Sequence, residues 1–301
     1  MTNMMITKDA TQANAITHGG SFHADEVMAT ALLLRIHPGL VIARVPNMEG
    51  IPADFKGIVY DIGYGEFDHH QDGKNGKRDD GIPYASAGLI WKKYGIQILQ
   101  DAHFSDIQDG FDKIDRELIE PIDARDNGIS YNGDVPMHTF SDIVESMNPV
   151  WNEETNTDEG FVRAVHLAEK VLERKLVRER SRQEAEYELN KELRYAKDGI
   201  LLLHRYLPWK EFAGRNPLMK DIYFVIFPSQ RGGYNIQCVP PDGKPMEQKK
   251  PIPKELRGKT ADEYAKAGLK GIIFVHNAGF MAAADTEENA LAFAKYLNRI
   301  S

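Results

Sequence analysis

Short apolar runs that alternate with longer helical patterns restrict the fold of this chain more than any other feature of its sequence. The runs are rich in β-branched residues, as buried strands are, and cover residues 15–17, 40–45 and 58–60. The helical patterns cover residues 25–36, 86–94 and 111–124, and are followed by Pro38, Gly95 and the Asn127-Gly128 pair as stop signals. Strands that alternate with helices predict an α/β domain with a largely parallel sheet.

The length of the chain, 301 residues, predicts two domains that each bury their own core. We expect a first domain at 1–154, a helical connector at 155–197 and a smaller C-terminal α/β domain at 198–301. Strand signals return in the last domain at 200–203, 222–227, 234–239 and 271–275, before a closing helix at 286–297. The first 14 residues are polar and predict a short solvated segment.

The connector contains the longest helical pattern in the chain. Its apolar residues are three and four positions apart and form one stripe, namely Phe161, Val165, Ala168, Leu172 and Leu176. The stripe fades over residues 182–194, which favours a helix packed between two domains over a coiled-coil arm.

Composition excludes several classes of protein. Acidic residues outnumber basic ones by 45 to 37, and the net charge of −8 argues against coating long duplex DNA by charge alone. A single cysteine, Cys238, excludes an internal disulfide and a cysteine-rich zinc module, and favours a reducing compartment. No apolar run approaches the roughly 18 residues of a membrane span, and the N-terminus lacks signal-peptide features. We therefore expect a cytoplasmic protein without a membrane partner.

Side chains of the kinds that bind metals gather in three segments of the first domain. The segments are residues 18–26, which begin with His18 and include His23 and Asp25, then Asp61, and then Asp68-His69-His70. His18 and Asp61 each follow a predicted strand, and ligands bind at this edge of open α/β sheets. His23 and Asp25 fall near the start of a helix, where free N–H groups attract anions. Imidazole and carboxylate without thiolate suit Mn²⁺, Mg²⁺, Co²⁺ or Zn²⁺.

Two other catalytic motifs, those of a serine hydrolase and of a P-loop, are incomplete in this sequence. Ser21 lacks the Gly-x-Ser-x-Gly surroundings of a hydrolase nucleophile. Gly258-Lys259-Thr260 has Pro253 where a phosphate-binding P-loop needs its first glycine.

Blocks of sequence that span almost the whole chain connect these segments to a known family. In chain order they are THGGSFHADE (17–26), YD (60–61), FDHHQ (67–71), SAG (86–88), IDARDNG (122–128), PWK (208–210), YNI (234–236) and FVHNAGF (274–280). Together they resemble the melanocyte-proliferating-gene family, a branch of the DHH-type metal-dependent phosphoesterases. The resemblance implies a two-domain DHH-phosphoesterase-like fold, with a metal-binding catalytic domain at 1–154 and a substrate-binding domain at 198–301.

The resemblance also implies a set of site residues. Two metal ions would be held by His18, His23, Asp25, Asp61, His69 and a later aspartate, either Asp123 or Asp126. These two aspartates lie three apart on one helix face, and Asp126 is preferred because the Asn127-Gly128 exit places it at a loop edge. His70 would face the substrate phosphate, and Asp68 would orient a neighbouring side chain. The wider superfamily has a carboxylate where His23 stands, so this site is less negative than the common pattern.

The reaction implied is two-metal hydrolysis of a phosphodiester. Two divalent ions about 3.5–4 Å apart would lower the pKa of a bridging water, and the resulting hydroxide would attack phosphorus in line. We expect two Mn²⁺ ions, with Mg²⁺, Co²⁺ and Zn²⁺ as alternatives. Protonated His70 would neutralise oxygens that gain charge.

Family resemblance points to a 3′-to-5′ exonuclease that acts on RNA or short single strands. In the C-terminal domain, His276, Arg231 and Lys249 are the candidate substrate contacts, although Asn277 stands where the family has a basic residue after the histidine. Residues 242–270 hold eight basic against five acidic side chains, a net charge of +3, which suits either a phosphate-facing segment or an ordinary solvated loop. The alternatives are a pyrophosphatase or nucleotide phosphatase and a non-enzymatic metal-binding scaffold. The sequence is compatible with an oligomer and does not give the oligomeric state.

Overall fold

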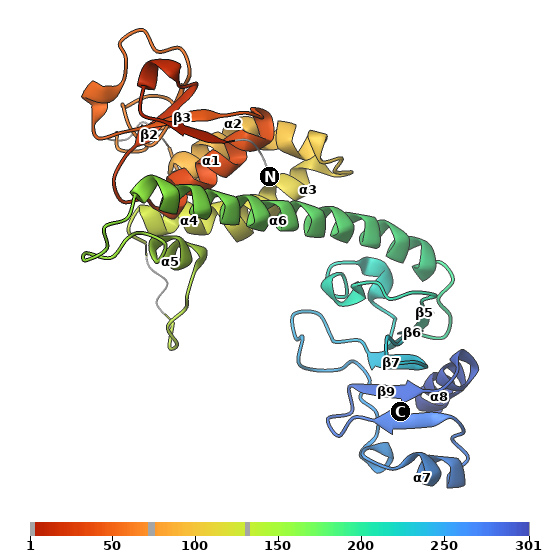
Figure 1. Cartoon of the computed structure of the whole chain (residues 1–301). Helices are drawn as coiled ribbons and strands as arrows, with labels where there is room; N and C mark the ends of the chain where they lie inside the picture. The colour runs from red at the N-terminus through yellow and green to blue at the C-terminus, as the bar shows by residue number, and fades with distance from the viewer. Residues whose placement is uncertain (1–3, 72–75, 130–132, 301) are drawn as a thin grey trace. The chain divides into compact units, whose positions relative to one another are not determined.

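Two sheets organise the chain, one in each of the units Met1–Ser181 and Arg182–Ser301 into which the structure divides (Figure 1). This computed structural model describes residues 4–71, 76–129 and 133–300. The predicted α/β class is confirmed, because helices alternate with strands and the first sheet is parallel throughout. Each unit has its own buried apolar core.

The sheet of the first unit brings together the C-terminal ends of its strands at one edge. Its strands, in spatial order, are β1 (Met5–Thr7), β3 (Val41–Val45), β2 (Ala15–His18) and β4 (Ile58–Val59). Residues 5–7 lie in the segment predicted to be solvated, and none of them is buried, but they form a strand that pairs in parallel with residues 41–43, which the sequence did not predict. A three-residue edge strand is too short to show a period in the sequence.

Helix α1 (Ala24–Ile36) is the central helix of the first unit. All its residues from Ala24 to Leu34 are buried, so it is apolar on every side and not amphipathic. The charged exceptions, Asp25 and Glu26, lie in its first turn and face the functional site described below. Burial of α1 on all sides over residues 24–34 explains why hydrophobic periodicity is weak in this part of the sequence.

Helix α2 (Ser86–Asp101) continues past Gly95, where the sequence predicted a stop. A Cβ atom at Gly95 would lie 2.7 Å from the ring of Phe111 and 2.8 Å from the ring of Trp91. The glycine therefore lets an aromatic ring pack against the helix backbone, and it does not end the helix.

The predicted helix at 111–124 is longer and is interrupted. It consists of α3 (Ile107–Ile114), a π-helical turn (Asp115–Ile119) and α4 (Glu120–Asp126). Pro121 explains the interruption, because proline cannot donate a backbone hydrogen bond and its ring clashes with the preceding turn. A short helix, α5 (Phe140–Glu145), follows.

Helix α6 (Thr157–Leu193) confirms the long helical pattern. Its predicted apolar stripe from Phe161 to Leu176 is buried in the first core. The expected loss of the stripe after residue 182 is wrong, since Ala185, Leu189 and Leu193 are buried in a core of the second unit. No helix in the described ranges is long and apolar enough to cross a membrane.

The second unit contains a mixed sheet. Its order is β5 (Ile200–Leu202), β6 (Phe224–Pro228), β7 (Tyr234–Cys238), β9 (Met281–Ala284) and β8 (Ile272–Val275). Only the β5–β6 pair among these is parallel. This unit also contains the last part of α6, together with α7 (Ala261–Lys266) and α8 (Glu287–Ile300). The sequence did not predict β9, because its three alanines have low strand propensity.

Candidate metal centre

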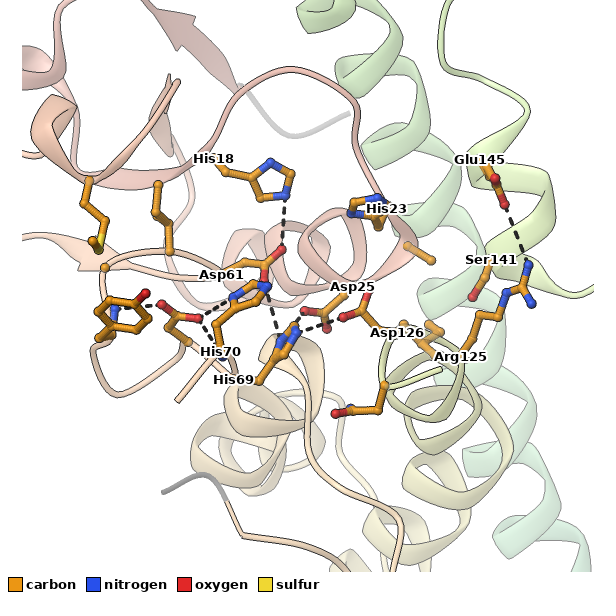
Figure 2. Close-up of a pocket in the computed structure, with 18 of the residues that line it drawn as sticks. His18, His23, Asp25, Asp61, His69, His70, Arg125, Asp126, Ser141 and Glu145 are labelled. Carbon is orange, nitrogen blue, oxygen red and sulfur yellow. Dashed lines mark hydrogen bonds and ion pairs between the residues drawn. The ribbon is translucent and has the colours of Figure 1, made fainter. Parts of the chain in front are cut away.

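A cavity of about 920 Å³ lies at the C-terminal edge of the parallel sheet (Figure 2). His18 is the last residue of β2, and Asp61 follows β4 by two positions. Asp61 has a backbone φ of +56°, a left-handed conformation that is unusual for a residue other than glycine. All the residues of the three predicted segments that the family resemblance implied as metal ligands line this cavity, namely His18, His23, Asp25, Asp61 and His69.

His69 lies at the centre of the carboxylates. Its Nε2 is 3.0 Å from Asp126 Oδ2, while its Nδ1 is 3.5 Å from oxygens of Asp25 and Asp61. Among the described residues, this buried Nδ1 has no hydrogen-bond partner. An unpartnered imidazole nitrogen that faces two carboxylates is an arrangement in which a cation fits.

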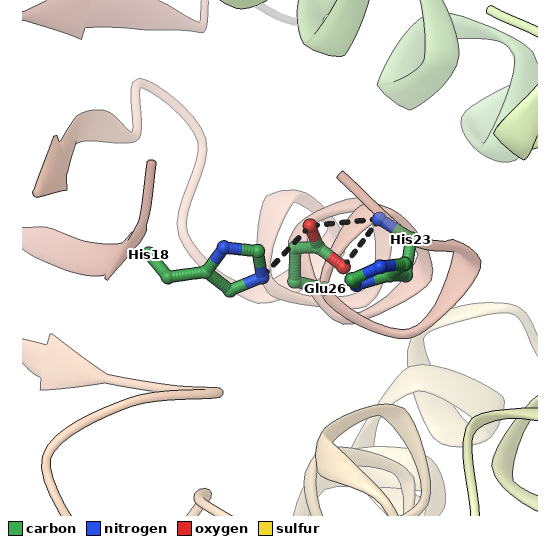
Figure 3. Close-up of side chains that lie close together, drawn as sticks. All are labelled: His18, His23 and Glu26. Carbon is green, nitrogen blue, oxygen red and sulfur yellow. Dashed lines mark hydrogen bonds and ion pairs between the residues drawn. The ribbon is translucent and has the colours of Figure 1, made fainter. Parts of the chain in front are cut away.

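His18 faces the other side of Asp61. Its Nε2 is 3.2 Å from Asp61 Oδ2 and 3.1 Å from Glu26 Oε1. Figure 3 shows Glu26 between His18 and His23, and its carboxylate accepts hydrogen bonds from the backbone N–H of His23 at 2.9 and 3.0 Å. Asp61 thus gives one oxygen to His18 and the other to His69.

Sequence reasoning missed Glu26 as a site residue. The available signal was its position, one turn after His23 and at the third residue of a helix, where a carboxylate reaches back to the first backbone N–H groups. Three groups of side chains place their ligand atoms within 4.8 Å of one another. They are His18, His23 and Glu26; Asp61, His69 and His70; and Asp25, His69 and Asp126.

Buried negative charge shapes the pKa values of this cluster. Burial alone would lower the pKa of His18, but hydrogen bonds to Asp61 and Glu26 outweigh it and raise the pKa to about 11. Burial would also lower the pKa of His69, but its interactions with Asp126 and Asp25 outweigh this effect and raise the pKa to about 11. Burial, together with the charge of Asp25, raises the pKa of Asp61 to about 7. The neighbouring carboxylates therefore keep His18 and His69 protonated in the metal-free site, and these two rings balance part of its negative charge.

Asp68 holds two neighbours in place. Its Oδ1 accepts a hydrogen bond from the backbone N–H of His70 at 3.0 Å and lies 2.7 Å from His70 Nδ1. Its Oδ2 accepts a hydrogen bond from the backbone N–H of Tyr64 at 2.7 Å. Burial would raise the pKa of Asp68, but these hydrogen bonds lower it. The His70 ring stacks on His69, with ring centres 4.2 Å apart, and its side chain is 55% exposed.

The two candidate late aspartates have different environments. Asp126 lines the cavity, whereas the fully buried Asp123 is 2.8 Å from the guanidinium of Arg78. Asp123 also accepts a hydrogen bond from the backbone N–H of Gly88 in the first turn of α2. Asp123 thus caps a helix, and it is not among the residues that line the cavity.

Further residues that the sequence did not single out line the cavity. Arg125, Ser141 and Glu145 come from α4 and α5. Figure 2 shows Arg125 paired with Glu145, at 3.8 Å, and Arg125 also lies 3.3 Å from Asp142. Arg125 lies in the IDARDNG block (122–128), but nothing in the sequence of that block indicated a functional role for the arginine.

The three candidate substrate contacts of the C-terminal domain all lie in the second unit. His276 follows β8, and its Nδ1 accepts a hydrogen bond from the backbone N–H of Ala278. Arg231 is exposed in the turn between β6 and β7. Lys249 donates hydrogen bonds to the backbone carbonyl groups of residues 219 and 220, at 2.8 and 2.9 Å. The ammonium group of Lys249 is therefore already hydrogen-bonded within the second unit.

Comparison with known proteins identifies the relatives of this chain. Residues 14–297 match the family model MYG1_exonuc, described as Uncharacterised protein family (UPF0160). The MYG1 exonuclease of Homo sapiens is 32% identical, over 93% of this chain and 84% of the human protein. The MYG1 protein of Saccharomyces cerevisiae is 31% identical, over 93% and 94% of the two chains. The MYG1 protein of Dictyostelium discoideum is 32% identical, over 94% and 96%.

Among solved structures, the chain is similar to RecJ from Thermus thermophilus in complex with Mn²⁺. The sequence identity is 14% and the TM-score 0.28, and the match covers 97% of this chain but only about half, 52%, of RecJ. The sequence comparisons are stronger, because a family model and full-length relatives agree over nearly the whole chain. The chain therefore belongs to the MYG1 family.

Proposed function

We propose that this protein is a metal-dependent phosphodiester hydrolase, a 3′-to-5′ exonuclease that acts on RNA or other short single strands. The observation that carries this proposal is the convergence of imidazoles and carboxylates in one open cavity, where buried His69 Nδ1 faces Asp25 and Asp61. Human and bovine relatives of this chain are called MYG1 exonuclease, which supports a nucleic-acid substrate.

The donor set suits two divalent cations. We assign His18, Asp61, His23 and Glu26 to one ion, and His69, Asp25, Asp126 and again Asp61 to the second. We propose Mn²⁺ first, with Mg²⁺, Co²⁺ and Zn²⁺ as alternatives that the same imidazole and carboxylate donors also suit. Such ions supply a water of lowered pKa and neutralise charge on the phosphate oxygens. Asp61 is assigned to both ions because each of its oxygens faces a different imidazole.

His70 has a different role in this proposal. Asp68 fixes its Nδ1, and the half-exposed ring stacks on His69, so its Nε2 remains for the substrate. In its protonated form, the ring donates a hydrogen bond from Nε2 to a phosphate oxygen that gains charge during hydrolysis. Residues 198–301 hold the rest of the strand, with His276 and Arg231 as the contacts.

The test is hydrolysis of a short RNA with a 3′-terminal label, in Mn²⁺, by the wild type, His69→Ala and His204→Ala. His204 is an exposed histidine of the second unit and serves as the matched control. We expect the wild type and His204→Ala to release the labelled nucleotide first, and His69→Ala to lose at least about a hundredfold in rate. Equal hydrolysis by His69→Ala would overturn the proposal. Phosphate release from pyrophosphate without RNA trimming would select the small-molecule alternative, and bound metal without any turnover the scaffold.

A further inference from the structure

Three large apolar or aromatic side chains line the cavity, although the cluster beside them is charged. They are Met48, from a 3-10 turn after β3, and Ile62 and Tyr64, from the loop after β4. We call these three side chains the wall. Met48 is 46% exposed and Tyr64 58% exposed. Two large, exposed side chains of this kind, next to a charged site, offer a contact surface for an apolar part of a ligand.

The backbone of Tyr64 is held in a conformation that its side chain disfavours. Its φ is +54°, in the left-handed region where a bulky residue is a true outlier. Asp68 maintains this conformation by accepting a hydrogen bond from the Tyr64 N–H, and the same carboxylate fixes the ring of His70. Strain of this kind persists where the surrounding structure determines it, and it gathers at ligand sites. The position of the tyrosine is thus tied to the position of a residue proposed to contact phosphate.

The chemistry of the wall selects among substrates. Inorganic phosphate and pyrophosphate present only charged oxygens, and an aromatic ring gives them nothing to pack against. A nucleobase presents a flat face, and stacking of bases on aromatic side chains tolerates any base. The cavity, at about 920 Å³, lies near the top of the roughly 300–1,000 Å³ range of ligand sites, and so has room for more than a phosphate.

We propose that Tyr64, with Met48 and Ile62 lining the same cavity, is the subsite that stacks the base of the nucleotide at the scissile phosphate. This inference rests on the proposed function and narrows its substrate to strands that carry a base at the 3′ end. Asp68 couples the two halves of the site, because one carboxylate orients both the base platform and His70.

Substitutions at position 64 separate binding from folding. Tyr64→Gly removes the ring and suits a φ of +54°, so the melting temperature should stay the same or rise. Tyr64→Asn also tolerates this conformation and lacks the ring. Tyr64→Phe keeps the ring and loses only the hydroxyl. Tyr187→Ala, at a 64% exposed tyrosine of α6, is the control for loss of a surface ring.

The experiment measures KM and kcat in Mn²⁺ on a short RNA and on the same RNA with an abasic 3′-terminal nucleotide. We expect Tyr64→Gly and Tyr64→Asn to raise KM for the normal RNA about tenfold with little change in kcat. Tyr64→Phe and Tyr187→Ala should match the wild type on it. On the abasic RNA, all these variants should match the wild type.

Three results would overturn the inference, and they are distinguishable. A wild type that trims RNA, together with an unchanged KM for both Tyr64→Gly and Tyr64→Asn, would refute the base subsite alone. Equal losses on the normal and abasic RNA would do the same, because the ring would then act on something other than the base. A wild type that hydrolyses neither RNA would refute the proposed function and the subsite together.

Discussion

Individual charges in the candidate site depend on one another. His18 and His69 remain protonated only because the carboxylates beside each ring outweigh the effect of burial on the imidazole pKa. Asp61 lies between these two rings, and its own pKa is raised because it is buried near other acids. Removal or addition of one charge therefore changes the protonation of its neighbours.

These shifts predict how the stability of the metal-free protein depends on pH. The folded-state pKa of His18 and of His69, about 11, exceeds the ordinary 6.5, so their stabilising effect is complete below pH 6.5 and is lost as pH rises towards 11. Asp61, with a pKa raised from 3.8 to about 7, costs stability between those two pH values, so nearly all of its effect is already present at pH 6.5. In EDTA, we expect the melting temperature to fall by at least about 5 °C between pH 6.5 and 9.5.

Thermal melts in EDTA and in Mn²⁺ test this expectation. Mn²⁺ should weaken or reverse the trend, because metal binding requires unprotonated imidazole and carboxylate. A melting temperature in EDTA that is constant or rises with pH would contradict the assigned shifts.

Asp68→Asn tests a residue that touches no proposed ligand atom. Asparagine keeps the shape but replaces one acceptor oxygen with a donor, so it cannot hold both Tyr64 and His70. We expect kcat for RNA to fall roughly 10- to 100-fold, as for partners that orient site residues. Asp54→Asn, at an exposed aspartate, is the control. Unchanged turnover by Asp68→Asn would show that the two contacts do not matter for the reaction.

Sequence alone could place the histidines and Asp61 together, because strand ends in a parallel sheet share one edge. The metal-ligand roles themselves stay predictions. Sequence could not choose between Asp123 and Asp126, since the choice depends on where Arg78 and the first turn of α2 lie. Glu26 was missed because a glutamate in a first helical turn is common in any helix.

At the scale of elements, the start of α2 depends on distant carboxylates. Ala85 precedes the helix and has no side chain to cap it. The first three free N–H groups, of residues 86 to 88, are instead bound by Asp25 and Asp123. The sequence predicted where this helix begins from its apolar pattern, but local propensity could not reveal what satisfies its N-terminus.

The capping of α2 by Asp123 predicts how Gly88→Ala changes the stability of the protein. In an exposed helix, glycine to alanine stabilises by about 1 kcal/mol. Here a Cβ atom would lie 1.9 Å from Asp123 Oδ2, so we expect a loss of about 2 kcal/mol in the free energy of unfolding. Urea unfolding measures it, and Gly65→Ala, with open space around the new Cβ, should be close to neutral. A stabilised Gly88→Ala would contradict the contact.

At the scale of the whole molecule, one helix contributes to the cores of both units. Leu172 of α6 is fully buried in the first core, and Leu189 of the same helix is fully buried in a core of the second unit. The sequence predicted the helix but not its second stripe, because buried polar side chains at residues 179, 182 and 183 separate the two.

Cys238 reports on the second unit. It is buried, and burial raises the pKa of its thiol to about 12, so native protein should resist thiol reagents at pH 8. In urea, labelling should follow unfolding of this unit. Leu189→Ala should lower the free energy of that transition by about 2–5 kcal/mol. Leu172→Ala, the same change in the part of α6 that packs in the first core, should lower the free energy of unfolding of the second unit less. Equal effects would mean that the two units unfold as one.

The double use of Asp25 has a practical consequence for substrate trapping. Both of its oxygens accept hydrogen bonds from the first turn of α2, at 2.8 and 2.6 Å. An inactive variant made at this position would expose the end of a buried helix as well as disable the cavity. Asp126 has no such duty among the described contacts, since its only ion pair there is with His69. A variant intended to capture an uncut strand is therefore better made as Asp126→Asn.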